Sequence, residues 1–188
     1  MSKITKKALA ASLKKLLAER PLDKITVIDI VNDCEVNRQT FYYHFQDIYD
    51  LLEWVYLNEA TKALDGKNTY DTWQQGFYYI FEYVQSNREF VLNTYNSVSR
   101  DYLENFLYKE TYALLIGVIE EKAKGMQIKQ SDKDFIANFY KYAFVGLMLD
   151  WIRKGMKENP SYIIEHLNVL IHGDVSKALK KFQISENE

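Results

Sequence analysis

Helix breakers and strand patterns are scarce in this sequence. Among its 188 residues there are 2 prolines and 7 glycines, and β-branched residues seldom alternate with polar ones. Proline and glycine interrupt helices, and half-buried strands need that alternation, so their scarcity favours long helices over strands and hairpins. The sequence therefore predicts an all-α fold of about nine helices.

Disulfide pairs and long apolar runs are missing as well. The single cysteine, Cys34, cannot form an internal disulfide, which agrees with a reducing compartment. No run of about 18 apolar residues occurs, and the first residues lack a signal-peptide pattern. We therefore expect a cytoplasmic protein that makes no membrane contact.

Excess positive charge is missing from the chain as a whole but not from its N-terminus. The net charge of −2 argues against a protein that coats nucleic acid regardless of sequence. Residues 1–20, however, hold six basic side chains and one acidic side chain, a local balance of +5. Positive charge at this end could meet a phosphate backbone.

The first third of the chain is expected to form four helices with clear start and stop signals. Pro21 ends the first helix, and Thr26 and Asn37 are candidate N-caps of the second and third. Gly66 follows the fourth. The apolar periodicity gives approximate ranges of 3–20, 27–34, 38–45 and 47–64.

Beyond Gly66 the sequence predicts four or five more helices. Short polar stretches separate them, and Pro160 lies in the last of these stretches. The approximate ranges of the helices are 70–85, 88–95, 99–124, 132–156 and 161–181.

The second and third expected helices are short and separated by about three residues, as in a helix-turn-helix. The major groove of DNA is about 12 Å wide and admits one helix, which a support helix must hold in register. Arg38 and Gln39 carry the donors and acceptors that read base edges, and Thr40 offers a hydroxyl and a methyl group. Tyr42 and His44 can donate to phosphate oxygens. From these residues alone, an amphipathic helical hairpin with a solvated polar face remains an open alternative.

Residues 25–45 resemble the DNA-binding signature of the tetracycline-repressor (TetR/AcrR) family. The most specific part is the aromatic run Thr40-Phe-Tyr-Tyr-His-Phe45, and the resemblance covers roughly residues 5–55. It implies a three-helix DNA-binding head at residues 1–47 and a larger helical body at residues 48–188 that binds an effector and dimerises. It also implies that a homodimer binds a palindromic operator in double-stranded DNA.

The resemblance assigns roles to individual residues of the head. Phe41 and Phe45 are implied to be core. The implied DNA-binding residues are Thr26, Asn37, Arg38, Gln39, Thr40, Tyr42, Tyr43 and His44. Two positions depart from the family pattern, because Glu35 stands where the turn usually has glycine and Ile48 where a lysine often begins the fourth helix. We therefore expect a strained or altered turn and one missing phosphate contact, for which Lys24 or lysines of the first helix would substitute.

Aromatic side chains crowd the second half of the chain. They could line a pocket for an apolar or aromatic effector, or they could form the core, and both interpretations remain open. The candidate effector-binding residues are Trp73, Phe77, Phe81, Tyr102, Phe106, Tyr140 and Phe144.

The segment 135–151 is apolar around most of its helical circumference, so it must be buried on more than one side. A dimer interface shared with the final helix would achieve this. The candidate interface residues are Phe135, Phe139, Ala143, Gly146, Trp151, Leu167 and Leu170. The stretch 151–155, Trp-Ile-Arg-Lys-Gly, is similar to the dihydroxyacetone-kinase regulator-like branch of the family, some members of which are thought to work through a protein coactivator.

Patterns of catalytic or metal-ligating residues do not occur in the sequence. The three histidines belong to no cluster with metal-ligand spacing, and no phosphate-binding loop, dinucleotide fingerprint or nucleophile elbow is present. We therefore expect no enzyme activity, no cofactor and no bound metal. The sequence is interpreted as a DNA-binding regulator, by default a repressor controlled by an unidentified small molecule. An activator that works through a protein coactivator and a helical protein-interaction adaptor remain alternatives.

Overall fold

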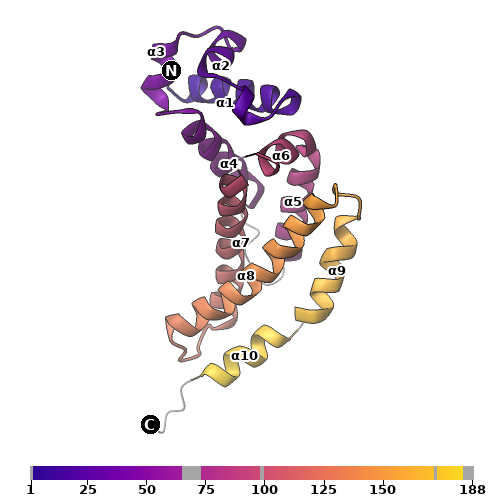
Figure 1. The fold of residues 1–188 in the computed structure, drawn as a ribbon. Helices are drawn as coiled ribbons and strands as arrows, with labels where there is room; N and C mark the ends of the chain where they lie inside the picture. The colour runs from indigo at the N-terminus through magenta and orange to yellow at the C-terminus, as the bar shows by residue number, and fades with distance from the viewer. Residues whose placement is uncertain (1, 65–72, 98–99, 172, 184–188) are drawn as a thin grey trace. The chain divides into compact units, whose positions relative to one another are not determined.

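The structure, a computed structural model, describes residues 2–64, 73–97, 100–171 and 173–183. Within these ranges the regular structure consists of ten α-helices and one short 3-10 turn at Leu22–Lys24, without strands, which confirms the all-α prediction (Figure 1). The helices are α1 (Ser2–Glu19), α2 (Val27–Asp33), α3 (Arg38–His44), α4 (Ile48–Leu64), α5 (Trp73–Ser86), α6 (Arg88–Tyr95), α7 (Arg100–Lys122), α8 (Gln130–Arg153), α9 (Pro160–Ile171) and α10 (Asp174–Phe182).

Packing divides the chain into two compact units. The N-terminal unit comprises Met1–Thr61 and Ser86–Phe106, and the C-terminal unit comprises Lys62–Gln85 and Leu107–Glu188. The chain passes from one unit to the other three times, within α4, at the end of α5 and within α7. As a result, α6 belongs to the same unit as α1, α2 and α3.

The core of the N-terminal unit begins with one face of α1. Leu9, Leu13 and Leu17 recur every four residues and are fully buried, which places them on the same side of the helix. Burying an aliphatic side chain of this size stabilises a fold by roughly 1.5–3 kcal/mol. The buried hydroxyl of Ser12 donates to the Ile30 carbonyl of α2 at 3.0 Å, so the polar group that α1 brings into this core is satisfied.

Helix α6 caps the C-terminal end of α1. The Leu17 carbonyl lies in the last turn of α1, where carbonyls have no partner within the helix. The Asn93 side-chain amide donates to it at 2.7 Å, across 76 residues of sequence. The Lys14 ammonium also lies 5.7 Å from the centroid of the Phe90 ring. These two contacts fix α6 against the first helix of the chain.

Stacked aromatic rings form much of the core of the C-terminal unit. The Phe77 ring of α5 lies parallel to the Phe144 ring of α8, with 3.9 Å between centroids, and Trp73 meets Phe144 edge-on. Phe81 contacts Trp151 edge-on at 5.0 Å. The Trp151 indole N–H donates to the Glu158 carbonyl at 2.9 Å. The rings are therefore packed against one another, and the buried indole donor has a partner.

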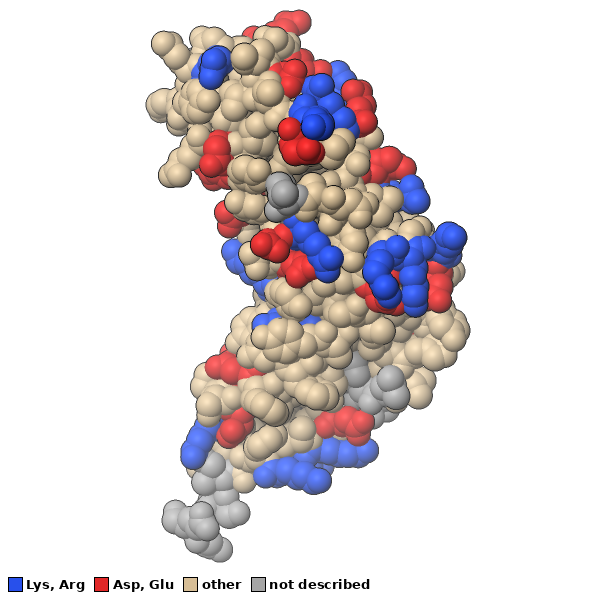
Figure 2. Space-filling view, in the orientation of Figure 1, with Lys and Arg blue, Asp and Glu red and all other residues tan. Residues whose placement is uncertain are grey.

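The prediction of a single final helix over 161–181 is wrong. The chain forms α9 and α10 instead, and Gly173 precedes α10 with a φ of +81°. A residue in this left-handed conformation ends helical hydrogen bonding, and glycine adopts it without a steric penalty. Val175 and Leu179 of α10 are buried, while its three lysines are exposed. Figure 2 shows a group of basic side chains at this end of the C-terminal unit.

Candidate nucleic-acid interface

Thr26 begins α2 through a reciprocal capping arrangement. Its hydroxyl oxygen accepts from the Asp29 N–H at 3.2 Å, while its own N–H donates to Asp29 Oδ2 at 2.8 Å. The Thr26 hydroxyl also donates to Asp29 Oδ2. Hydrogen bonds from the Thr26 side chain and backbone hold the pKa of the Asp29 carboxyl below its usual value. Thr26 is therefore an N-cap, as predicted, and its hydroxyl proton is already shared with Asp29.

The turn between α2 and α3 has the geometry that normally selects glycine. The Val36 N–H donates to the Val31 carbonyl and the Glu35 N–H to the Asn32 carbonyl, which is the pattern of a Schellman motif. Glu35 occupies its left-handed position with a φ of +55°. A side chain in this conformation costs roughly 1–2 kcal/mol, because Cβ approaches a carbonyl oxygen. The turn is thus strained at the residue that departs from the family pattern.

We expect Glu35→Gly to raise the free energy of unfolding by about 1 kcal/mol, because glycine removes the steric cost but adds entropy to the unfolded chain. Urea denaturation followed by circular dichroism measures the change. Glu35→Gln is the matched control, since it removes the charge and keeps the strained backbone. An equal gain in both variants would mean that charge, rather than backbone strain, destabilises the turn.

Asn37 begins α3 and fixes the orientation of its first turn. Its side-chain oxygen accepts from the Thr40 N–H at 2.8 Å and from the Thr40 hydroxyl at 2.9 Å. The side-chain NH2 group of Asn37 and the methyl group of Thr40 remain available for contacts with bases. Arg38 and Gln39 lie between them and are exposed, so this turn presents both donors and acceptors to solvent.

The two sides of α3 differ sharply in burial. Phe41 is 0% exposed and Phe45 is 3% exposed, with 6.0 Å between their ring centroids, which confirms that both belong to the core. Tyr42 and Tyr43 are 51% and 82% exposed. His44 is half-buried and meets the Tyr43 ring edge-on. The exposed Tyr42 and Tyr43, which the sequence assigns to DNA, and the buried Phe41, which it assigns to the core, therefore lie on different sides of α3.

The start of α4 is capped by acidic side chains. The Asp47 carboxylate accepts from the Asp50 N–H, and the Asp50 carboxylate accepts from the Gln46 N–H, both at 2.9 Å. Ile48 is the first residue of the helix and is half-buried. Because isoleucine is uncharged, this position has no cation for a phosphate. The Lys6 ammonium lies 5.1 Å from the centroid of the Phe45 ring, which brings one lysine of α1 to the C-terminal end of α3.

The candidate effector-binding residues fall into both units. The Tyr102 ring stacks on the Tyr49 ring with 5.5 Å between centroids, and the centroids of the Phe106 and Tyr56 rings are 4.9 Å apart. Burial raises the pKa of the Tyr140 hydroxyl. The N-terminal unit contains Tyr102 and Phe106, and the C-terminal unit contains Trp73, Phe77, Phe81, Tyr140 and Phe144. Most of these rings contact other rings, so their role in effector binding stays a prediction.

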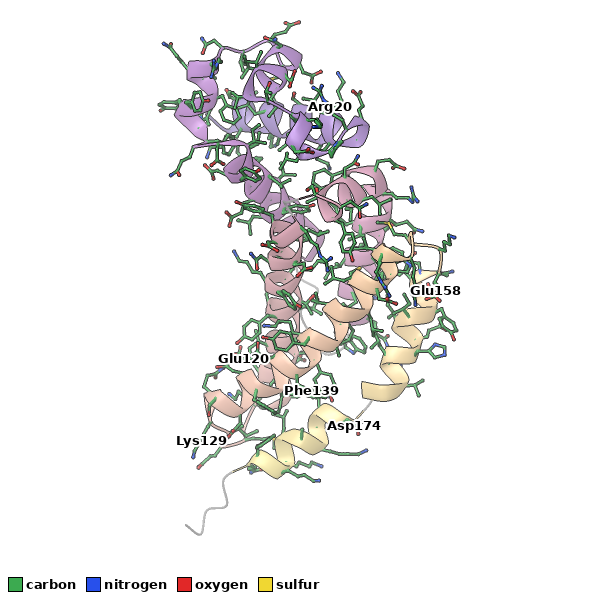
Figure 3. The ribbon with its side chains drawn as sticks, in the orientation of Figure 1. Arg20, Glu120, Lys129, Phe139, Glu158 and Asp174 are labelled. Atoms are coloured by element: carbon green, nitrogen blue, oxygen red, sulfur yellow. The ribbon has the colours of Figure 1, made fainter. Side chains whose placement is uncertain are left out.

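The candidate dimer residues divide between surface and core. Phe135 and Phe139 of α8 are 65% and 62% exposed, and Ala143 and Gly146 are also exposed. These four residues lie along one face of the helix, and Figure 3 labels Phe139 there. Trp151 and Leu167 are buried within the C-terminal unit, and the Leu170 side chain lies outside the described part of the structure. Figure 2 shows few charged side chains over the middle of α8.

Metal and membrane sites were also expected to be absent. Within the described ranges, no three histidine, cysteine, aspartate or glutamate side chains lie close enough together to hold a metal ion. Among the helices in those ranges, none combines the length and the apolar character needed to cross a bilayer.

Family comparisons define the class of protein to which this chain belongs. Residues 9–55 match the family model described as "Bacterial regulatory proteins, tetR family". Residues 71–173, more than half of the chain, match the TetR model described as "Transcriptional regulator C-terminal region". These matches define a DNA-binding transcriptional regulator rather than an enzyme. The chain belongs to the TetR family.

Individual relatives indicate the branch within the family. The "HTH-type dhaKLM operon transcriptional activator DhaS" of Lactococcus lactis subsp. lactis (strain IL1403) is 28% identical over 154 residues, which are 81% of each chain. A solved structure named "Dihydroxyacetone kinase operon activator DhaS" is 26% identical, with a TM-score of 0.70 over 96% of this chain and 99% of that one. The chain is therefore a regulator of the DhaS-like branch, as the resemblance of residues 151–155 suggested.

A more distant relative shares the fold alone. NalD, "the secondary repressor of MexAB-OprM multidrug efflux pump in Pseudomonas aeruginosa", is 16% identical, with a TM-score of 0.57 over 99% of this chain and 100% of that one.

Proposed function

We propose that the protein binds a palindromic operator as a homodimer and places one α3 helix per subunit in each of two successive major grooves. The exposed side of α3 carries this proposal. Arg38 and Gln39 present base-reading groups there, while the buried Phe41 fixes the helix from its other side. Half-sites of such a dimer are centred one turn of DNA apart, about 34–36 Å.

Base reading and phosphate binding are assigned to different residues of the interface. Arg38 and Gln39 read base edges, helped by the Asn37 amide and the Thr40 methyl group. The exposed Tyr42 and Tyr43, together with His44, donate to phosphates, and Lys6 supplies the cation that Ile48 does not. Thr26 contacts phosphate by turning its hydroxyl hydrogen bond from the Asp29 carboxylate to a phosphate oxygen of the DNA backbone. These assignments separate side chains that set sequence preference from those that set overall affinity.

Two substitutions in α3 test this division of roles. We expect Gln39→Ala to change base preference at particular operator positions by about 1–3 kcal/mol, because a base-reading contact is lost. We expect Tyr42→Ala to weaken binding by a similar factor on every sequence, because phosphates carry no sequence information. Binding to a randomised operator library measures both effects. Unchanged affinity and preference in Gln39→Ala would show that the assigned register of α3 is wrong.

The exposed face of α8 supports the homodimer. Phe135, Phe139 and Tyr142 follow one another at spacings of four and three residues, and each is more than half exposed. A row of large apolar side chains on a surface is typical of a protein contact. The exposed Gly146 continues the same face and would let a second helix approach closely. A two-fold dimer would pair this face with itself.

Effector binding in the body would shift the protein between DNA-competent and DNA-incompetent states. In this proposal, residues 1–47 form the DNA-binding domain and residues 48–188 form the domain that binds the effector and dimerises. The seven aromatic residues named above remain the candidates for effector binding. A protein that regulates genes in this way acts in the cytoplasm, where bacterial DNA lies.

Regulation can take either direction, and repression is the default expectation for the family. Activation is the second candidate, because the relative DhaS is named as an activator, and a protein coactivator would then be a further partner. Transcript levels beside the operator, compared with and without the gene, distinguish the two. A rise on deletion indicates repression, and a fall indicates activation. A protein-interaction adaptor would leave these transcripts unchanged.

A further inference from the structure

A groove lies between α5 and α9 of the C-terminal unit, among residues that the sequence analysis did not select. Its volume is about 260 Å³, and its lining includes Gln74, Tyr78 and Tyr79 of α5 and Ser161, Ile164 and Glu165 of α9. This volume is slightly below the roughly 300–1,000 Å³ of ordinary ligand pockets, so the groove suits a small molecule.

The groove has a negative charge. Among the described residues that line it, Glu165 carries the only formal charge, and lysine and arginine are missing from the lining. Glu82 is exposed one turn along α5 from Tyr78 and adds a second negative charge on that side of the helix. The Ser161 N–H at the start of α9 already donates to the Asn159 side-chain oxygen at 2.9 Å, so this amide is not open to an anion. The electrostatic environment therefore favours a cation.

The aromatic side chains of the groove are suited to a cation as well. The Tyr78 and Tyr79 rings line the groove on its α5 side as an edge-to-face pair, with 6.4 Å between their centroids and an interplanar angle of 76°. Faces of aromatic rings attract ammonium groups through the negative potential of the π electrons. Ile164 is buried in the floor of the same groove and offers an apolar surface to the rest of a ligand.

We propose that this groove binds a small organic cation, with an ammonium group between Glu165 and the two tyrosine rings and an apolar body against Ile164. The proposal concerns binding by the protein alone, so it holds or fails independently of the operator and of the dimer.

Titration of the full chain with benzyltrimethylammonium, observed by calorimetry and by NMR of the tyrosine rings, tests the proposal. Benzyl alcohol and benzoate serve as the neutral and anionic probes of similar shape. We expect saturable binding of the ammonium compound, with shifts at Tyr78 and Tyr79, and much weaker binding of the other two. Equal binding of the three probes, or no saturable binding of the ammonium compound, would overturn the proposal.

Glu165→Gln keeps the shape of the groove and removes its charge. We expect it to weaken binding of benzyltrimethylammonium about tenfold or more, because a charge-assisted contact is lost. Glu120→Gln is the matched control, since it removes one exposed charge from α7 (Figure 3) outside the groove and should leave binding unchanged. Similar affinities of the two variants would contradict the role of Glu165. Should Glu165→Gln fail to fold, the affinities of the unaltered chain for the three probes decide whether the groove prefers a cation.

Discussion

Phe41→Ala is expected to destabilise the N-terminal unit by about 3–5 kcal/mol, the range measured for deleting a buried phenylalanine side chain. Phe41 is fully buried and contacts the rings of Tyr42 and Phe45. Its removal leaves a cavity beneath α3, and the surrounding helices can close it only in part. Because whole domains are stable by only about 5–15 kcal/mol, this loss should unfold the helix-turn-helix at a much lower urea concentration and abolish specific DNA binding.

Tyr43→Ala is the matched control for Phe41→Ala. It removes an aromatic ring from the same helix, but Tyr43 is largely exposed. Its stability should change by no more than about 0.5 kcal/mol, although its affinity for DNA should fall. Urea denaturation of both variants, followed by near-ultraviolet circular dichroism, makes the comparison. Equal stability of the two variants would contradict the inward orientation of Phe41.

Phe139→Glu is expected to convert the proposed dimer into monomers. The side chain stands on the exposed apolar face of α8, and a two-fold axis would bring two copies of each substitution into one interface. Burying two carboxylates without partners costs several kcal/mol, so the dimer dissociation constant should rise about 100-fold or more. Operator affinity should fall with it, because a monomer reads a single half-site. Sedimentation equilibrium and gel-shift titration measure the two effects.

Ala113→Glu is the control for charge alone. It introduces the same carboxylate at an exposed position of α7, outside the row of α8 residues proposed for the dimer. We expect it to leave both the dimer and the operator affinity unchanged. A Phe139→Glu protein that still sediments as a dimer would show that another surface makes the contact.

The helix-turn-helix could be predicted from the sequence because its signals are local. Thr26 and Asn37 were identified as N-caps, and both side chains accept from the backbone three residues on. The resemblance implied that Phe41 and Phe45 are core, and both are buried. Glu35 was identified as a departure from the family pattern, and its positive φ explains why glycine is usual there. Each of these features depends on a few neighbouring residues.

Features that depend on distant residues were predicted less well. The periodic apolar pattern continues across the α9–α10 boundary, so the left-handed Gly173 was missed. Phe144 and Trp151 belong to the same apolar stretch of α8 as Phe139, yet they pack against α5 while Phe139 faces solvent. Periodicity shows that α8 has several apolar sides, but only tertiary packing decides which of them is covered.

The α5–α9 groove could not be found from the sequence for the same reason. Tyr78 and Glu165 are far apart in the chain. In the sequence, each looks like an ordinary residue on the exposed face of a helix. Only the packing of the two helices brings them to one cavity. The Asn93 contact with the Leu17 carbonyl is a similar case, because an asparagine within α6 shows no local sign of capping a helix 76 residues earlier.

Selection of genomic fragments by the purified protein at physiological salt, followed by footprinting of the enriched fragments, tests the central claim most directly. A sequence-specific dimer should enrich a small set of fragments and protect an inverted repeat with half-sites about one helical turn apart. The Gln39→Ala protein should enrich a different set of fragments, and the Phe139→Glu protein should enrich none. Protection of every sequence to the same extent, or no enrichment at all, would contradict the account of this protein as an operator-binding dimer.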